Sequence, residues 1–298
     1  MNESILATII LPTTADRGIL LPLCVGSIQR QTLQAFELFI IGDGVDEGTR
    51  AVILDLMRED GRIHFFDHPK HPRRGELYRH QALQQARGFF VAYICDRDLW
   101  LSHHLQTLAK HLSTADLVAT NYYYVRRNQQ LFLPYLPVSP QQATVLSILS
   151  AAGHRLDFYK KLPYGWRTTP VNRPTDLYMW EQIIAQPNCR FAIAWQPTLL
   201  YFKRNDHPGW PTAQRYEELA RWTAIMQTPV ELQSAIDQAL ASLFCERNQF
   251  KRSWILVRGK RLSDLPDWLR GKVQRWLKRP SDPSAEESWL PDPIESDR

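Results

Sequence analysis

Two carboxylates follow directly on an apolar run, and acids of that spacing can hold a cation. The stretch from Phe89 to Cys95 consists almost entirely of β-forming residues without polar alternation, which is typical of a central strand covered on both faces. Asp96 and Asp98 follow one residue apart. Ligands of open α/β sheets bind beyond the carboxyl ends of the strands, so this pair can hold a hard divalent cation beside a diphosphate. The alternative is a loop acid followed by an N-cap, with Asp98 capping a helix that begins near Leu99.

The segments around this run alternate between strand-like and helix-like patterns. Strands are predicted at 4–11, 36–41, 63–67, 89–95 and 116–125, the first of them ended by Pro12. Helices are predicted at 19–31, 49–59, 76–87 and 101–112. This order predicts an α/β fold with a doubly wound, mostly parallel sheet flanked by helices.

Composition limits the class of protein. With 298 residues, 44% of them hydrophobic, the chain can bury one substantial core and carry a smaller appendage. Its four cysteines have no paired spacing, which fits reduced thiols in a cytosolic compartment better than disulfides or a zinc site. Neither a signal peptide nor a transmembrane helix is predicted. The expected location is the cytoplasm, with peripheral binding at the cytoplasmic face of a membrane as the alternative.

Five segments carry a resemblance that spacing alone does not establish. They are ATIILPTT (7–14), SIQRQTLQAFELFIIGDGVDEGT (27–49), GELYRHQALQQARGFFVAYICDRDLWLSHHL (75–105), PTDLYMWEQII (174–184) and RFAIAWQPTLLYFKR (190–204). In order and approximate spacing they resemble a family 2 glycosyltransferase of the GT-A fold. One such segment would be a weak signal, but the ordered set is strong.

The resemblance implies a nucleotide site at the ends of the first strands. Pro12 and Thr13 match the residues whose backbone passes beneath the base, and Asp43 matches the acid that accepts from the uracil imide. Arg79 matches an arginine near the base and phosphates, where a planar, always charged group is favourable. Asp96 is also among the nucleotide-binding residues that the resemblance implies. The alternatives are that Asp43 only favours a glycine-flanked turn and that Arg79 is a solvated helix residue.

The resemblance also implies a metal site. Asp96 and Asp98 would hold Mn²⁺ or Mg²⁺ that bridges the diphosphate and neutralises charge on the leaving group. In the wider GT-A group a late histidine can complete such a site, which makes His207 a candidate; neutral imidazole suits manganese better than magnesium. The alternative for His207 is a solvated histidine in a Pro/Gly loop.

Asp176 is the candidate catalytic base. It matches the acid before the late helix, which in inverting members deprotonates the acceptor hydroxyl. The alternative is an N-cap for a helix over 177–184.

Some positions depart from the family pattern. Gly42 stands where a second acid is usual, and Cys95 and Arg97 interrupt the acid-rich motif before Leu99 and Trp100. Either aspartate could therefore be the metal acid, and Arg97 could supply part of the positive charge at the diphosphate. The alternative function is a catalytically inactive GT-A-like protein that binds a nucleotide or acts as a scaffold.

Aromatic residues mark the half of the chain expected to bind the acceptor. Sugars present C–H faces that stack on aromatic rings, and the alternative for each ring is core packing. The candidates are Tyr122, Tyr123, Tyr124, Trp166, Trp180 and Trp210.

The C-terminal part is predicted to be a helical extension. We expect a GT-A domain over 1–210, with a nucleotide half (1–126) and an acceptor half (127–210), and then packed helices over 211–250. The segment 251–279 carries ten Lys or Arg against two Asp, with Trp and Leu at helical spacing. This pattern is typical of a helix on an anionic membrane surface, and the alternative is docking on the protein's own core. The acidic segment 280–298 is predicted to be disordered.

Together with these residues, the resemblance implies a metal-dependent, inverting, hexosyltransferase-like enzyme. It would move a sugar from a nucleotide-diphosphate donor, with a UDP-sugar favoured, to a hydroxyl of a glycan or lipid-linked acceptor in polysaccharide or glycan biosynthesis. Nucleic-acid binding is suggested only by the basic segment, and the acidic tail argues against it.

Overall fold

A nine-stranded mixed sheet forms the centre of the first of two compact units, Met1–Ala239. The computed structural model describes residues 4–134 and 148–259, with side chains through residue 246. The sheet order is β3 (Ile63–His68), β2 (Phe36–Asp43), β1 (Ala7–Thr14), β4 (Phe90–Tyr93), β8 (Ala152–Arg155), β6 (Leu117–Val125), β9 (Phe191–Tyr201) and β5 (Leu99–Trp100), and β7 (Leu131–Phe132) pairs with β6.

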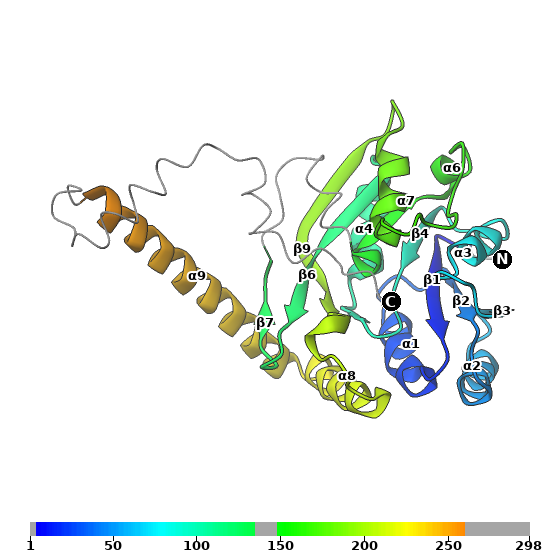
Figure 1. Ribbon diagram of the computed structural model, residues 1–298, viewed down its shortest axis with the longest axis horizontal. Coiled ribbons are helices and arrows are strands. Elements are labelled where there is room, and N and C mark those ends of the chain that lie inside the picture. The colour runs from blue at the N-terminus through cyan, green and yellow to red at the C-terminus, as the bar shows by residue number, and fades with distance from the viewer. Residues whose placement is uncertain (1–3, 135–147, 260–298) are drawn as a thin grey trace. The chain divides into compact units, whose positions relative to one another are not determined.

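Helices flank this sheet, as Figure 1 shows. They are α1 (Leu21–Gln29), α2 (Glu47–Glu59), α3 (Glu76–Leu83), α4 (His104–Leu112), α6 (Leu156–Tyr159), α7 (Thr175–Ile184) and α8 (Thr212–Gln227), and α9 (Pro229–Gly259) follows α8 in the chain. Short 3-10 turns are η1 (Gly18–Leu20), η3 (Leu149–Ala151) and η4 (Arg204–Asp206). The predicted α/β class is therefore confirmed.

Parallel pairing is concentrated in the first half of the chain. β3, β2, β1 and β4 are all parallel, and β6 pairs parallel with β9. β4, β8 and β6 pair antiparallel in succession, as do β5 with β9 and β7 with β6. The uniformly parallel part is the part that brings strand ends to one edge.

Pro12 does not end the first strand, contrary to the sequence-based expectation. β1 continues to Thr14, with Pro12 opposite Ile41 of β2. On its other side β1 pairs with β4 only as far as Ile10. Beyond that point β1 is locally an edge strand, where proline costs no ladder hydrogen bond.

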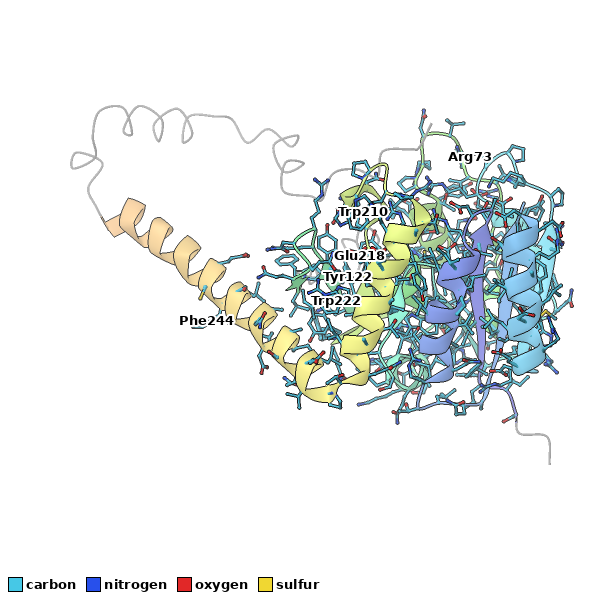
Figure 2. The ribbon with its side chains drawn as sticks, turned by 90° about the horizontal axis from the view of Figure 1, so that it is seen from below. Arg73, Tyr122, Trp210, Glu218, Trp222 and Phe244 are labelled. Atoms are coloured by element: carbon cyan, nitrogen blue, oxygen red, sulfur yellow. The ribbon has the colours of Figure 1, made fainter. Side chains whose placement is uncertain are left out.

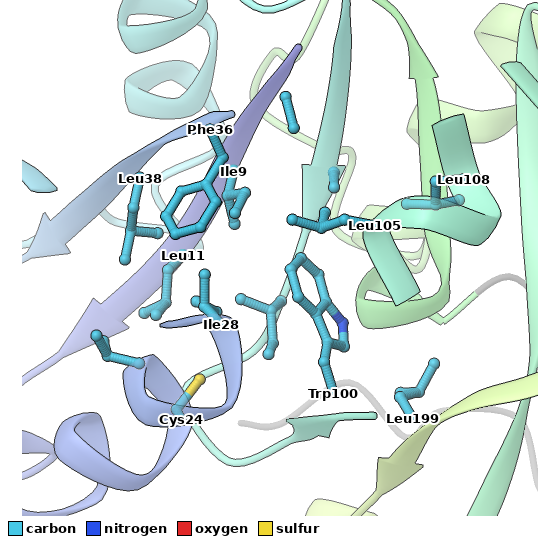
Figure 3. Close-up of a cluster of buried hydrophobic side chains, with 14 of the residues drawn as sticks. Ile9, Leu11, Cys24, Ile28, Phe36, Leu38, Trp100, Leu105, Leu108 and Leu199 are labelled. Atoms are coloured by element: carbon cyan, nitrogen blue, oxygen red, sulfur yellow. The ribbon is translucent and has the colours of Figure 1, made fainter. Parts of the chain in front are cut away.

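Side-chain alternation divides the core between the two faces of the sheet. Ile9 and Leu11 pack with α1, α2 and α4, whereas Ile10 packs with α3, α6 and α7. In Figure 3 the Trp100 indole lies among side chains from the first of these faces. A third cluster joins β5, β6 and β9 to α8 and to the beginning of α9, and Trp222 is its largest member in α8.

The second unit, Leu240–Arg298, is described only as the continuation of α9 to Gly259. Of the predicted basic segment 251–279, only the helical backbone to Gly259 is described, and the predicted acidic tail lies outside the described residues. Among the helices that the structure describes, none is both long and apolar enough to cross a membrane.

A buried carboxylate ties three strands together. Glu37 on β2 accepts hydrogen bonds from Thr8 Oγ1 at 2.7 Å and from the backbone N–H of Arg87 at 2.7 Å. The Gly88 N–H donates to Thr8 Oγ1 at 3.0 Å, immediately before β4 begins. A Cβ on Gly88 would lie 2.4 Å from the backbone nitrogen of Thr8. The start of β4 is therefore pressed against β1 with no room for a side chain.

We expect Gly88→Ala to lower the free energy of unfolding by about 1–3 kcal/mol, because a backbone atom must shift to admit the methyl group. Gly61→Ala is the matched control, since nothing lies within 4 Å of a Cβ there. Urea titrations of both variants measure the difference. Equal stability of the two variants would contradict the tight approach of β4 to β1.

Candidate functional site

The sheet brings three of the predicted nucleotide residues to one edge. Thr13 lies near the end of β1, Asp43 ends β2, and Asp96 follows β4. Thr13 Oγ1 donates to Asp96 Oδ2 at 3.0 Å, and Thr14 Oγ1 donates to the backbone carbonyl of Asp43 at 2.8 Å. These bonds join the carboxyl ends of three parallel strands, where ligands bind in open α/β sheets.

Asp43 is held by the loop that follows β3. Its carboxylate accepts the backbone N–H of His71 at 2.6 Å and also the ammonium of Lys70. A Cβ on Gly75, where φ is +64°, would lie 3.2 Å from Asp43 Cγ. The positive φ favours glycine at position 75, and a side chain there would also crowd the Asp43 carboxylate. Sequence reasoning missed Lys70 and His71, although the basic character of the loop 68–74 was a usable signal.

The missing acid at position 42 has a steric explanation. A Cβ on Gly42 would lie 2.9 Å from Phe65 Cε2 on β3 and 3.2 Å from Val45 Cγ1. The aromatic ring occupies the space in which an acidic side chain would begin. Asp43 is thus the carboxylate that this strand end can present.

The two aspartates after β4 have different environments. Asp98 is fully buried, and its oxygens accept from Ser150 Oγ and from the backbone N–H of Phe202. Burial raises its pKa to about 6, while Arg97 and the two hydrogen bonds act in the opposite direction. The helix-cap alternative for Asp98 is wrong, because Leu99–Trp100 forms the strand β5 and α4 begins only at His104.

Asp96 retains free acceptor capacity. It is nearly buried, but only Oδ2 is engaged among the described residues, by Thr13. Between the two acids, Arg97 donates from Nε to the carbonyl of Phe202 at 3.1 Å. Both side chains therefore hold the backbone of Phe202, just after β9: Asp98 accepts its N–H and Arg97 donates to its carbonyl.

Asp176 and Arg79 lie close to each other. Arg79 Nη1 lies 3.9 Å from Asp176 Oδ1, and the guanidinium lies 4.7 Å from the centre of the Trp166 ring. Arg79 is buried, and its Nε and Nη1 have no hydrogen-bond partner in the described part of the chain. Asp176 keeps 33% of its side chain exposed. A cation with two unsatisfied donors beside a partly exposed acid is an arrangement that can bind an anionic or hydroxylic ligand.

Burial raises the pKa of Asp176, and the charges of Arg79, Arg74 and Arg97 oppose that rise. The N-cap alternative for Asp176 is wrong, because α7 begins at Thr175 with Pro174 as its cap residue and no side-chain cap bond. The acid therefore lies in the first turn, where the helix dipole favours the carboxylate.

Glu76 is a site residue that no sequence pattern indicated. It is fully buried at the start of α3, where it accepts the backbone N–H of Arg74 at 3.1 Å and that of Thr169 at 3.3 Å. It therefore ties the basic loop to the segment that precedes α7.

The predicted sugar-stacking aromatic residues are mostly structural. Trp166 and Trp180 are buried, and Trp166 Nε1 donates to the hydroxyl of Tyr93 at 2.9 Å. Tyr122 and Tyr123 are buried as well, while Tyr124 is partly exposed and donates to Asp206. For these tryptophans the structure favours the alternative of core packing.

Trp210 and His207 form a stacked pair, with ring centres 3.6 Å apart. His207 Nε2 lies 3.6 Å from Glu218 Oε1 of α8. Within the described residues, no group of three or more His, Cys, Asp and Glu side chains is arranged to hold a metal ion. The role of His207 as a metal ligand therefore stays a prediction.

Curated glycosyltransferases match parts of the chain, among them the following two. The GalNAc(5)-diNAcBac-PP-undecaprenol beta-1,3-glucosyltransferase of Campylobacter jejuni is 32% identical over 101 residues, which are 34% of this chain and 32% of that protein. The uncharacterized glycosyltransferase EpsJ of Bacillus subtilis is 24% identical over 115 residues, 37% of this chain and 32% of that protein. The chain thus spans about a third of the length of these relatives.

Solved structures of S. aureus TarS share the fold. TarS 1–349 in complex with UDP-GlcNAc superposes with a TM-score of 0.56 at 16% identity, covering 74% of this chain and 66% of that one. Its complex with UDP gives a TM-score of 0.53 at 16% identity, over 88% of this chain and 78% of that one. The predicted GT-A type of α/β fold is confirmed by this likeness.

The family model described as Glycosyl transferase family 2 matches residues 8–167, which include β1, Asp43, Arg79 and the Asp96–Asp98 pair. Because this match covers more than half of the 298 residues and the fold agrees, the chain belongs to glycosyl transferase family 2.

Proposed function

We propose that this protein transfers a sugar from a nucleotide-diphosphate donor to a hydroxyl acceptor, with a UDP-sugar as donor and inversion at the anomeric carbon. The observation that carries the proposal is the placement of Asp43, Arg79, Asp96 and Asp176 around one edge of the sheet, within and next to the family segment. The TarS complexes, whose titles name UDP and UDP-GlcNAc, support a uridine donor.

Asp43 is the proposed contact for the uracil base. The imide N–H is a hydrogen-bond donor, and each carboxylate oxygen can accept more than one hydrogen bond. Lys70 and the His71 N–H keep the carboxylate in place before the base arrives. The backbone of Pro12 and Thr13 would pass beneath the base, because these residues lie near the carboxyl end of β1, at the same edge of the sheet.

The residues present fit a divalent cation whose ligands come mainly from the diphosphate of the donor. Mg²⁺ and similar ions are commonly bound by one or two carboxylates, with phosphate and water oxygens completing the shell. Asp96, with its free oxygen, is the proposed protein ligand, and Asp98 is the proposed support that positions the loop. His207 is a further proposed contact of the metal or a phosphate. The bound cation would neutralise charge on the leaving diphosphate.

Asp176 is the proposed general base. The acceptor hydroxyl oxygen attacks the anomeric carbon from the face opposite the diphosphate, and its proton passes to the Asp176 carboxylate. The bond between the anomeric carbon and the diphosphate oxygen breaks, and its electron pair leaves with the nucleotide. Arg79 favours the ionised form of Asp176 and so keeps the base ready to accept a proton.

We propose a glycan or lipid-linked acceptor, in polysaccharide or glycan biosynthesis. The support is the Campylobacter relative, whose name specifies an undecaprenol-diphosphate-linked glycan as its acceptor. Peripheral attachment at a membrane through 251–279 belongs to the same proposal.

We expect Mn²⁺ to strengthen UDP binding to the wild-type protein and Asp96→Asn to weaken metal-dependent binding about tenfold, or about 1.4 kcal/mol. Calorimetric titration of UDP with and without Mn²⁺ measures this effect. Asp98→Asn is the matched control, because an amide can still bond Ser150 and Phe202. Loss of the metal response in Asp98→Asn alone would reverse the assignment. No UDP binding by the folded wild-type protein would overturn the uridine-donor proposal.

We expect Asp176→Asn to reduce turnover by about 10²–10⁴-fold while UDP affinity stays the same, because an amide cannot take the proton. In the wild type, the rate should fall as the pH drops through a pKa raised above 3.8. Arg79→Gln should move this acidic limb to higher pH, because a neighbouring positive charge is removed. Steady-state rates across a pH series measure both effects. Full activity of Asp176→Asn would exclude Asp176 as the base, whereas UDP binding without turnover by the wild type would favour the non-catalytic alternative.

A further inference from the structure

The indole of Trp166 contacts both helices that carry the pair formed by Arg79 and Asp176. Its face lies 4.7 Å from the Arg79 guanidinium of α3. It also meets the ring of Trp180 edge to face, with ring centres 5.7 Å apart and planes at 75°. Trp180 follows Asp176 by about one turn of α7, so the two residues lie on the same side of that helix. One side chain therefore contacts the helix of the cation and the helix of the acid.

Hydrogen bonds alone do not fix the Arg79 guanidinium. Within the described residues its side chain makes one hydrogen bond, from Nη2 to the carbonyl of Arg74 at 3.2 Å, while Nε and Nη1 are buried without a partner. Nη1 lies 3.9 Å from Asp176 Oδ1, which is too far for a hydrogen bond. The electron-rich face of an indole attracts a cation. Trp166 therefore supplies a contact that the polar partners of Arg79 do not.

A chain of buried hydrogen bonds fixes the indole itself. Trp166 Nε1 donates to the Tyr93 hydroxyl at 2.9 Å, and that hydroxyl lies 2.7 Å from His154 Nε2. His154 Nδ1 lies 3.0 Å from the carbonyl of Arg155, which can only accept, so Nδ1 carries a proton. Burial lowers the pKa of His154 to about 4, so at neutral pH the ring is uncharged and Nε2 accepts from Tyr93. Each donor in this chain thus has its acceptor.

The backbone of Trp166 is also held against α3. Its N–H donates to the Tyr159 hydroxyl at 2.9 Å, and this hydroxyl lies 2.8 Å from Nδ1 of His80, the neighbour of Arg79. A Cβ on Gly165 would overlap the Tyr159 hydroxyl and would lie 2.6 Å from His80 Nδ1. Glycine at position 165 therefore leaves the space in which Tyr159 connects this loop to α3.

We propose that Trp166 is a positioning residue, which holds the Arg79 guanidinium beside the Asp176 carboxylate by contacting α3 and α7 at once. The consequence for catalysis rests on the proposed function, in which Asp176 is the base. The holding of Arg79 by Trp166 does not depend on that function.

Several titratable groups surround the Asp176 carboxyl. They are Arg79, Arg74, Arg97, Glu76, Tyr93 and Cys95. The three arginines lower the pKa of Asp176, against burial and the charge of Glu76. Arg79 is the member of this group whose guanidinium lies over the Trp166 ring in the described part of the chain. If the ring is removed and Arg79 moves away, the pKa of Asp176 rises, and the base is lost at a higher pH.

The test combines steady-state rates across a pH series with a ¹³C NMR titration of the Asp176 carboxyl, whose resonance is identified by its absence in Asp176→Asn. Trp166→Leu should move both midpoints up by about 0.5–1 pH unit, a part of the about 1–3 units by which a neighbouring arginine lowers a carboxyl pKa. Trp166→Phe should move them less, because a phenyl face attracts a cation more weakly. The double variant Trp166→Leu/Arg79→Gln should shift no further than Arg79→Gln, because both changes act through one guanidinium.

Trp222→Leu is the matched control. Trp222 is a buried tryptophan of α8 whose Nε1 donates to Gln129 Oε1 at 3.1 Å. Figure 2 shows it well apart from Arg73, which precedes α3. Its substitution should lower the melting temperature without moving either midpoint. Thermal melting checks that each variant is folded, and if Trp166→Leu does not fold, Trp166→Phe takes its place in every comparison.

Three results would overturn the role of Trp166: unchanged midpoints in a folded Trp166 variant, equal shifts in Trp222→Leu, or additive shifts in the double variant. If the wild type shows no turnover, the NMR titration decides alone. A shift in Trp166→Leu would then support the holding of Arg79 while the proposed function fails. Turnover by the wild type with no shift in the variants would leave the proposed function standing without this role of Trp166.

Discussion

The hydrogen bond from Thr13 Oγ1 to Asp96 Oδ2 joins the ends of β1 and β4, and the site depends on it. Parallel pairing of β3, β2, β1 and β4 brings their carboxyl ends to one edge, but it does not determine how the loops beyond that edge are arranged. The Thr13 bond, with the Thr14 bond to the Asp43 carbonyl, fixes the positions of two acids relative to each other. These contacts lie within the segment that carries the family match.

Buried charges in this molecule act mostly as connectors. Glu37 links β1, β2 and the start of β4; Glu76 links the basic loop to the segment before α7; and Asp98 links the β4–β5 loop to η3 and the end of β9. Each of these carboxylates accepts several hydrogen bonds, which offsets the cost of removing it from water. Asp96 and Asp176 have fewer hydrogen-bond partners among the described residues, so their carboxylates keep acceptor capacity.

Positive charge is distributed differently from negative charge around the site. Lys70 and the N–H of His71 hold Asp43, Arg79 faces Asp176, and Arg97 and Arg215 donate to backbone carbonyls of the segment after β9. Within the part of the chain that the structure describes, Arg79 Nε and Nη1 are buried without hydrogen-bond partners. An anionic ligand would supply acceptors to these donors, and such donors also suit the binding of a charged donor and the stabilisation of its leaving group.

The local sequence pattern was sufficient to predict the alternation of strands and helices. The spacing of apolar residues, and the glycine or acidic residues at strand ends, can be recognised within a few neighbouring residues. The ordered motifs were sufficient for the family, and they identified Asp43, Asp96 and Asp176 as positions to inspect. Element ends were less certain: Pro12 was expected to end β1, and only the early end of β4 explains why it does not.

The sequence by itself determined the α/β class, the family and the set of acids available for chemistry. Only the tertiary structure decided that Asp98 is an internal anchor while Asp96 keeps an oxygen that no described residue engages, since a spacing of one residue does not specify which carboxylate is covered by Ser150 and Phe202. It alone decided that Trp166 and Trp180 belong to the core and that Arg215 of α8 bonds the segment after β9. Contacts between residues far apart in the chain depend on how α8 and the end of β9 pack against the sheet, and no local pattern encodes that packing.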